Sequence, residues 1–261
     1  MQIYKFHFIE KQSNITIISE SKHIILRAKK EFYYQRQLLE DYISHHKEFL
    51  TSFSPVRVQT EYEVVNLMAQ GAFLCDVGPM ATVAGAFADI MLKIMKSYIS
   101  EFNIAKIALI ENGGEVANDS EKTMKVALFA GNNQLSIKIG FLLKKEDSPI
   151  GIATSSATIG HAISLGEADA VTIFANTTTI ADGASTRVCN LVKGLDIEKS
   201  IKRALDTVDD MEGVKGAFIS RQNMVGLTGK IPEIFRLNEE NGLELKKKLE
   251  YQFPENFEII K

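Results

Sequence analysis

The spacing of the apolar residues changes once along this chain, and that change limits the folds that the sequence can adopt. Up to about residue 100, two segments repeat apolar residues at helical spacing, 29–50 and 79–100. From Ile104 onward, short apolar runs are separated mostly by Gly, Asn and Asp. Helical blocks between antiparallel meanders are typical of α+β proteins and not of a regular βαβ alternation. The sequence therefore predicts one compact α+β domain over residues 1–261.

The first part of that domain, residues 1–100, is predicted to hold strands and then helices. The predicted strands are 1–9, 15–18 and 24–27. The predicted helices are 29–50, 61–70 and 79–100. Ser54-Pro55 ends the first helix, and its expected core residues are Phe32, Leu39, Ile43 and Leu50. The third helix is rich in Ala and Gly, which predicts close packing against a sheet or another helix.

The remaining chain is predicted as a motif-bearing core, 101–195, and a C-terminal helix with strands, 196–261. The predicted strands are 104–110, 125–130, 135–139, 151–154, 171–174, 214–220 and 224–227. The predicted helices are 180–193 and 197–208.

Composition and charge exclude several classes of protein. With 30 Lys+Arg against 33 Asp+Glu and a net charge of -3, the chain is not a dedicated nucleic-acid binder. Its 2 cysteines cannot build a disulfide framework or a zinc site, which favours a reducing compartment. No signal peptide is recognised, and carboxylates interrupt the most apolar stretch, 67–95, so no membrane span is predicted. We expect a soluble, cytoplasmic protein.

The first motif is Asn112-Gly113-Gly114, flanked by Glu111 and Glu115 after an apolar strand. Paired glycines let a ligand approach the main chain, and Asn112 can donate and accept hydrogen bonds at a loop tip. A plain hairpin turn is the alternative.

The second motif is the strand end Ala153-Thr154-Ser155-Ser156, followed by His161. Successive N–H groups and hydroxyls suit a phosphate or the edge of a flavin ring. A serine nucleophile needs a histidine base, for which His161 is the candidate, but no nucleophile-elbow sequence accompanies it. A Ser/Thr-capped turn, with His161 at the surface, is equally compatible.

The third motif contains Asp182 and Thr186, which lie one turn apart if the segment is helical. A carboxylate and a hydroxyl, completed by carbonyls, waters and phosphate, suit Mg²⁺. The alternative is that Asp182 is a helix N-cap.

Taken in this order, these segments resemble the motifs of the ApbE family, the FAD:protein FMN transferases, and most closely its unsecreted branch. Five stretches carry the resemblance: Asp76-Val77-Gly78, Glu111-Asn112-Gly113-Gly114, Gly151-Ile152-Ala153-Thr154-Ser155, Val171-Thr172-Ile173 and Ala181-Asp182-Gly183-Ala184-Ser185-Thr186. They are similar to the family's Asp-Leu-Gly-Gly, Asn-x-Gly-Gly, Val-Ala-Thr-Ser-Gly, Val-Thr-Val and Ala-Asp-Ala-x-x-Thr. The family's His-x-x-Asp-Pro loop is matched only by His161-Ala162-Ile163-Ser164.

The resemblance implies a single ApbE-like, T-fold-like domain of antiparallel sheets and packed helices. It also implies that Asp182 and Thr186 bind Mg²⁺, that FAD or FMN is bound, and that FMN is transferred to a Thr or Ser of a target protein. An aspartate such as Asp182 near the acceptor hydroxyl is suited to removing its proton. The first and second motifs would contact the nucleotide-like ligand.

Two other functions stay open. The first is a non-catalytic binding or accessory protein on the same scaffold, which the missing Asp-Pro favours. The second is an enzyme acting on an unrelated small substrate, in anaerobe sulfur or cofactor metabolism, with His161 and Ser155 as the first residues to test. We expect no nucleic-acid or membrane partner, and the exposed strands at both ends of the chain are compatible with a homodimer.

Overall fold

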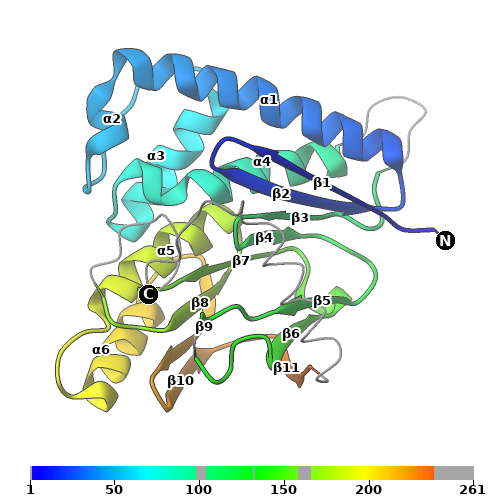
Figure 1. Cartoon of the computed structure of the whole chain (residues 1–261). Helices are drawn as coiled ribbons and strands as arrows, with labels where there is room; N and C mark the ends of the chain where they lie inside the picture. Colours follow the sequence, from blue (N-terminus) through cyan, green and yellow to red (C-terminus); the bar gives the residue numbers. More distant parts are fainter. Residues whose placement is uncertain (1, 98–103, 132, 158–165, 238–261) are drawn as a thin grey trace, which may run out of the picture.

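A large antiparallel sheet with helices on one face and a small sheet on the other makes up this protein (Figure 1). The computed structural model describes residues 2–97, 104–131, 133–157 and 166–237. The large sheet has the order β1-β2-β3-β4-β7-β8-β9-β10, and the small one β11-β6-β5. Every pair of neighbouring strands is antiparallel. The prediction of an α+β fold with antiparallel sheets and packed helices is confirmed.

The strands of the large sheet are β1 (Tyr4–Glu10), β2 (Ser13–Ser19), β3 (Leu109–Asn112), β4 (Glu115–Asn118), β7 (Ile150–Ser155), β8 (Ala170–Ala175), β9 (Val214–Arg221) and β10 (Met224–Gly229). Those of the small sheet are β5 (Met124–Ala127), β6 (Ile139–Leu143) and β11 (Glu233–Arg236). The helices are α1 (Lys22–His45), α2 (Lys47–Thr51), α3 (Glu63–Cys75), α4 (Val83–Lys96), α5 (Thr178–Leu191) and α6 (Ile197–Asp209). The described residues also include two short 3-10 helices, η1 (Pro79–Thr82) and η2 (Lys145–Asp147).

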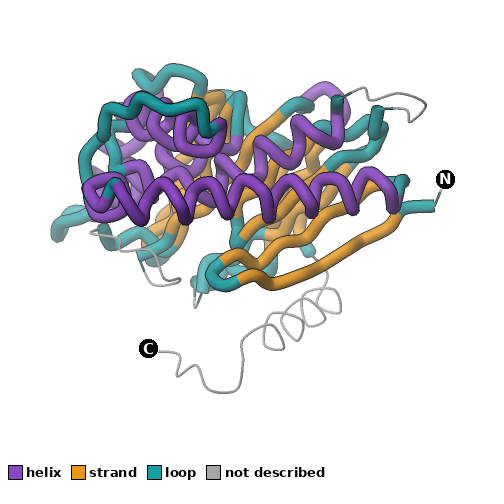
Figure 2. Tube along the Cα trace, turned by 90° about the horizontal axis from the view of Figure 1, so that it is seen from above, coloured by secondary structure: helices purple, strands orange, loops and turns teal. Residues whose placement is uncertain are grey.

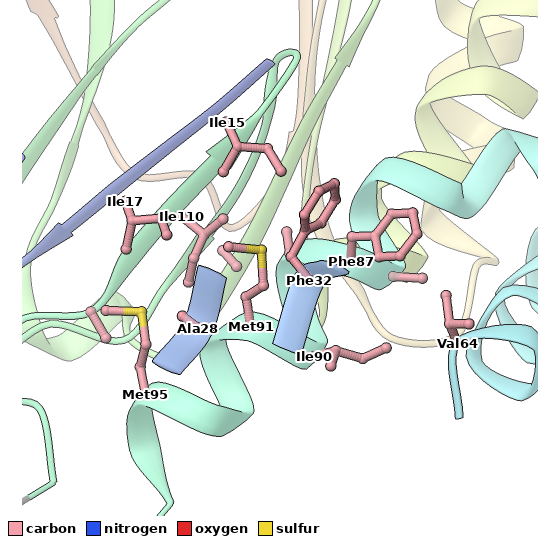
Figure 3. Close-up of a cluster of buried hydrophobic side chains, with 14 of the residues drawn as sticks. Ile15, Ile17, Ala28, Phe32, Val64, Phe87, Ile90, Met91, Met95 and Ile110 are labelled. Carbon is pink, nitrogen blue, oxygen red and sulfur yellow. The ribbon is translucent and has the colours of Figure 1, made fainter. Parts of the chain in front are cut away.

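Three clusters of buried side chains hold these layers together. The first lies between β2, β3 and the helices α1, α3 and α4, with Phe32, Phe87 and Met91 near its centre (Figure 3). The second joins α5 and α6 to β7, β8 and β9. The third fills the space between the large and small sheets, where Phe141 contacts Phe174 and Phe218 edge-on. Figure 2, the view from above, shows the long α1 running across the width of the molecule.

The predicted strand 24–27 is wrong, because these residues belong to α1. Ser21 caps that helix by accepting a hydrogen bond from the Ile24 amide. Ile24, Ala28 and Phe32 are buried at helical spacing, and a short apolar run alone does not separate a strand from a helix. Leu50 is also misassigned to the core: it is 39% exposed, and its neighbour Phe49 is buried instead.

The strands around residues 104–143 are shifted from their predicted positions. Only the end of the predicted strand 104–110 is regular, since β3 begins at Leu109. Residues 135–138 form turns, and the strand β6 starts at Ile139. The sequence did not predict β4 or β11, because four-residue strands give too little alternation to recognise.

No single helix within the described residues is long and apolar enough to cross a membrane. Helix α3 and the segment η1–α4 pass that test only as a pair, which is bent by 100°.

Candidate functional site

Helix α5 carries the third motif and lies directly on the large sheet. It follows β8, begins after the N-cap Thr177, and runs back along β7. A Cβ added to Gly151 of β7 would lie 2.2 Å from the Thr178 nitrogen, and one added to Gly166 would lie 1.8 Å from the Cys189 carbonyl oxygen. Strand β7 and helix α5 run in the same direction from the contact between Gly151 and Thr178. Ser155, at the end of the strand, and Thr186, on the helix, are each about 12–13 Å from that contact, so they lie at about the same level.

Asp182 is not the N-cap of its own helix, because Thr177 has that role. It lies in the second turn of α5, and its carboxylate accepts a hydrogen bond of 2.9 Å from the Gly85 amide, near the beginning of α4. A Cβ at Gly85 would lie 2.4 Å from the Thr178 carbonyl oxygen, so a glycine is required for this approach of the two helices. The N-cap interpretation was therefore wrong for α5, although Asp182 does satisfy an N-terminal amide of α4.

In the same way, the carboxylate of Asp89 in α4 accepts hydrogen bonds from the first amides of α5. Its carboxylate accepts hydrogen bonds from the Thr178 amide at 2.8 Å, the Thr179 amide at 2.8 Å and the Thr179 hydroxyl at 2.6 Å. Each of the two helices thus receives, at its positive N-terminal end, a carboxylate from the other. This reciprocal arrangement fixes Asp182 one turn away from an anchored helix start.

Three carboxyl groups gather around this point, those of Asp89, Asp182 and Glu115, and Glu111 interacts with Glu115 from the other side of the glycine turn. Burial raises the pKa of Asp182 to about 7, against the hydrogen bond from Gly85, and repulsion by Asp89 adds to the rise. Burial and repulsion by Asp182 raise the pKa of Glu115 well above its usual range. The cluster therefore retains protons that isolated carboxylic acids would lose, and a cation would favour their release.

The first motif forms the hairpin turn between β3 and β4, as the plain interpretation predicted. Asn112 pairs with Glu115, and the two glycines between them have φ angles of 71° and 121°. Asn112 is buried, and its amide nitrogen donates to the Ala84 carbonyl oxygen at 3.1 Å. It therefore ties β3 to the start of α4 and is not a free group at a loop tip.

A cavity of about 150 Å³ lies beside this turn, between the two sheets. It joins the first motif to the second, because Gly113 and Gly114 line it together with Thr154 and Ser156. The remaining lining residues are Val126, Ala127, Leu128, Phe129, Phe141, Ile152 and Thr172. The hydroxyls of Thr154 and Thr172 are 2.9 Å apart. The cavity thus has apolar walls and a hydroxyl-bearing side.

The cavity and Asp182 lie on opposite faces of the large sheet. Ile152, on the face of Thr154, belongs to the core between the sheets, whereas Ala153 is buried with α5 on the helical face. The two faces meet at the glycine turn, where a Cβ at Gly113 would lie 3.7 Å from a carboxylate oxygen of Glu115.

The other predicted site residues have separate locations. Thr186 and Ser155 are half-buried on the helical face, and within the described part of the chain their hydroxyls make no hydrogen bond. His161 lies outside the described residues. No group of three or more His, Cys, Asp or Glu that could hold a metal ion occurs among the residues described.

Three residues of this region were not predicted as site residues: Asp89, Glu115 and Arg187. Asp89 had a detectable signal, since it is a lone carboxylate in an apolar helical stretch. Glu115 was quoted only as a flank of the turn. Arg187 follows Thr186 directly, and its guanidinium lies 3.0 Å from the carboxylate of Asp76.

Comparison with known proteins gives a consistent set of relatives. The sequence profile of the family described as AbpE bacteria matches residues 2–214. A UPF0280 protein of Methanocaldococcus jannaschii is 39% identical over 236 residues, which cover 89% of this chain and 93% of the relative. A UPF0280 protein of Methanococcus vannielii is 36% identical and covers 90% of this chain and 94% of its own length.

Two solved structures have a similar fold. The flavinyl transferase ApbE of Pseudomonas stutzeri, in its apo form, superposes with a TM-score of 0.58 over 88% of this chain and 94% of that chain, at 15% identity. The flavin transferase ApbE of Vibrio cholerae gives a TM-score of 0.54 over 88% of this chain and 97% of that chain, at 11% identity. At these identities the likeness concerns the fold alone.

Proposed function

This chain belongs to the family described as AbpE bacteria, and we propose that it binds a flavin nucleotide together with Mg²⁺ and transfers FMN to a protein hydroxyl. One observation carries the proposal. Asp182 and Thr186 lie one turn apart on α5, and Asp182 stands in a cluster of carboxyl groups close to the Gly113-Gly114 turn of the cavity.

The donor set near Asp182 fits Mg²⁺ that is shared with a phosphate ligand. Mg²⁺ is usually held by one or two carboxylates, several waters and substrate phosphates and not by an all-protein cage. Asp182 provides a buried carboxylate, and the Thr186 hydroxyl makes no hydrogen bond within the described residues. Burial raises the pKa of Asp182 to about 7, and a bound cation would lower it again.

Each motif has a role in the proposed complex. Asp182 and Thr186 would hold the metal ion, which when bound neutralises phosphate charge. The glycine turn would admit the ligand close to the main chain, while Thr154, Ser156 and Thr172 would offer hydroxyls to its polar edge. The buried amide of Asn112 would act indirectly, by tying the turn to α4.

The reaction balances as an in-line displacement at phosphorus. The oxygen of an acceptor Ser or Thr bonds to the FMN phosphorus, the anhydride bond of FAD breaks, and AMP leaves. The acceptor proton passes to a carboxylate, for which Asp182 is the candidate base.

A non-catalytic flavin-binding protein is the second candidate function. The hydrogen bond from the Gly85 amide to Asp182 favours this second function, because the carboxylate already joins α5 to α4. The sequence His161-Ala162-Ile163-Ser164, which lacks the family's Asp-Pro, favours it too.

A fluorescence titration with FAD and FMN, with and without Mg²⁺, tests binding. Wild type should bind more tightly with Mg²⁺, and Asp182→Asn should lose that dependence. Asp206→Asn is the control, because Asp206 is exposed on α6. Failure of wild type to bind either nucleotide would refute the proposal, as would a Mg²⁺ dependence that survives in Asp182→Asn.

Transfer is tested separately, with FAD, Mg²⁺ and candidate acceptor proteins analysed by mass spectrometry. Covalently bound FMN on a Ser or Thr supports the transferase. Tight binding without any adduct favours the binding protein.

A further inference from the structure

Resting on the proposed function, we propose that Arg187 binds a phosphate group of the ligand and that Asp76 is the internal anion that this phosphate displaces. Arg187 follows Thr186 in α5, and its partner Asp76 is the C-cap of α3. Neither residue belongs to the metal pair or the cavity lining.

A phosphate ligand needs a cationic partner here. The residues that line the cavity include no Lys or Arg within the described chain. Three carboxyl groups, those of Asp89, Asp182 and Glu115, lie around the first two turns of α5 and repel anions, even though their raised pKa values reduce that charge. The two negative charges of the FAD pyrophosphate and the metal-binding carboxylate of Asp182 together exceed the two positive charges of one Mg²⁺, so a second cation would complete the balance. Arg187 is the residue that follows Thr186.

Arg187 follows Thr186 on α5, and its side chain turns about 100° around the helix from Thr186, toward the end of α3. Gly183, one turn earlier, packs against Cys75, since a Cβ there would lie 3.0 Å from the Cys75 Cβ. This contact brings the end of α3, and hence Asp76, alongside the turn that ends in Arg187. The hydroxyl of Thr186 lies at the adjacent position, and that of Ser155 at about the same level, both half-buried and without a hydrogen bond in the described residues.

The ion pair with Asp76 is weak enough to exchange. Its side chains are 40% exposed for Arg187 and 68% exposed for Asp76. Exposed pairs of this kind change an equilibrium constant by about fivefold or less. A guanidinium can bind a phosphate through two parallel charge-assisted hydrogen bonds, whereas its exposed pair with Asp76 contributes little. The pair therefore holds the guanidinium near the site until a phosphate replaces the carboxylate.

Two variants with opposite expected effects test this exchange. Arg187→Ala should weaken the binding of pyrophosphate and FAD, at fixed Mg²⁺, by about tenfold or more. Asp76→Asn should strengthen both by about two- to fivefold, since it removes the competitor. Asn tolerates the φ of 53° at this position as well as Asp does. Riboflavin, which has no phosphate, should bind equally to all three proteins, and the double variant should behave like Arg187→Ala.

The surface pair Lys93–Glu63 provides matched controls. It joins α4 to α3 at 2.7 Å with side-chain exposures of 68% and 38%, and neither residue belongs to the cavity lining or to the proposed metal pair. Lys93→Ala and Glu63→Gln should leave both affinities unchanged. Arg187→Lys should lose part of the affinity, because a lysine cannot form two parallel bonds.

The outcomes distinguish this inference from the function on which it rests. Unchanged pyrophosphate and FAD affinity in Arg187→Ala, or weaker binding in Asp76→Asn, would overturn the role of Arg187 even if FAD binds with Mg²⁺. Opposite shifts with pyrophosphate in a protein that binds no flavin would support the phosphate site and reject the flavin function. A wild type that binds neither pyrophosphate nor FAD would overturn both.

Discussion

Replacing Asp89 by Asn should destabilise the fold, and the expected size follows from the contacts of Asp89. Its carboxylate accepts three hydrogen bonds at the start of α5, from the Thr178 amide, the Thr179 amide and the Thr179 hydroxyl. Asn retains one acceptor oxygen and turns an NH₂ group toward donors. Between one and two bonds are lost, and each hydrogen bond to a charged group contributes about 1.5–3 kcal/mol.

An opposing effect reduces this loss. Burial raises the pKa of Asp89, so the ionised carboxylate is penalised in the folded protein, and a neutral amide avoids that penalty. Leaving amides unpaired at the start of a packed helix destabilises the protein by more than the removal of the buried charge stabilises it. We therefore expect Asp89→Asn to lower the free energy of unfolding by about 2–3 kcal/mol.

The assay is urea denaturation at neutral pH, followed by circular dichroism, with the slope m compared between proteins. Asp196→Asn is the matched control, because the Asp196 carboxylate also accepts from a helix N-terminal amide, that of Lys199 at 3.0 Å, but near the surface. Asn and Asp are nearly equivalent at an N-cap, so the control should change stability by less than about 0.5 kcal/mol. An Asp89→Asn protein as stable as this control would refute the reciprocal-capping argument.

Three further predictions concern the same two helices. The pKa of Asp182 is raised to about 7, so the folded protein keeps a proton that the unfolded chain releases near pH 4. The free energy of unfolding should therefore fall as the pH rises from about 4 to 7. Urea midpoints measured at pH 5 and pH 8 should differ less in Asp182→Asn than in wild type. At pH 8, adding Mg²⁺ should raise the midpoint of wild type but not of Asp182→Asn, and equal shifts would argue against the metal role. Gly85→Ala should lower the free energy of unfolding by about 1–3 kcal/mol, because its methyl group would lie 2.4 Å from the Thr178 carbonyl oxygen. The variant should also bind Mg²⁺ more weakly, since the shift of α4 would move Asp182. Unchanged urea and Mg²⁺ titrations would contradict the close approach of the two helices.

Local sequence spacing predicted part of the local geometry in this region. The helical spacing of Asp182 and Thr186 appears in α5, and the paired glycines form the expected hairpin turn. These features depend on neighbouring residues, so periodicity and turn chemistry are enough to predict them.

The pairings that complete the site depend on distant parts of the chain. The contact between Asp89 and Thr179 joins residues 90 positions apart, and the contact between Asn112 and Ala84 joins residues 28 apart. The hydroxyl pair Thr154–Thr172 follows from the register of β7 and β8. No pattern within a single segment encodes such partners. From the sequence alone, Asp89 was therefore interpreted only as a charge that interrupts an apolar stretch.

The reciprocal carboxylates also affect how this part of the molecule opens. Neither α4 nor α5 can fray at its N-terminus alone, since unwinding either one removes the carboxylate that satisfies the other. The backbone amides of Gly85, Thr178 and Thr179 should therefore exchange with deuterium together, at one opening free energy. Because the partners are far apart in sequence, re-forming this unit after it opens requires the closure of a long loop. The proposed metal ligands thus belong to one cooperative unit of the fold.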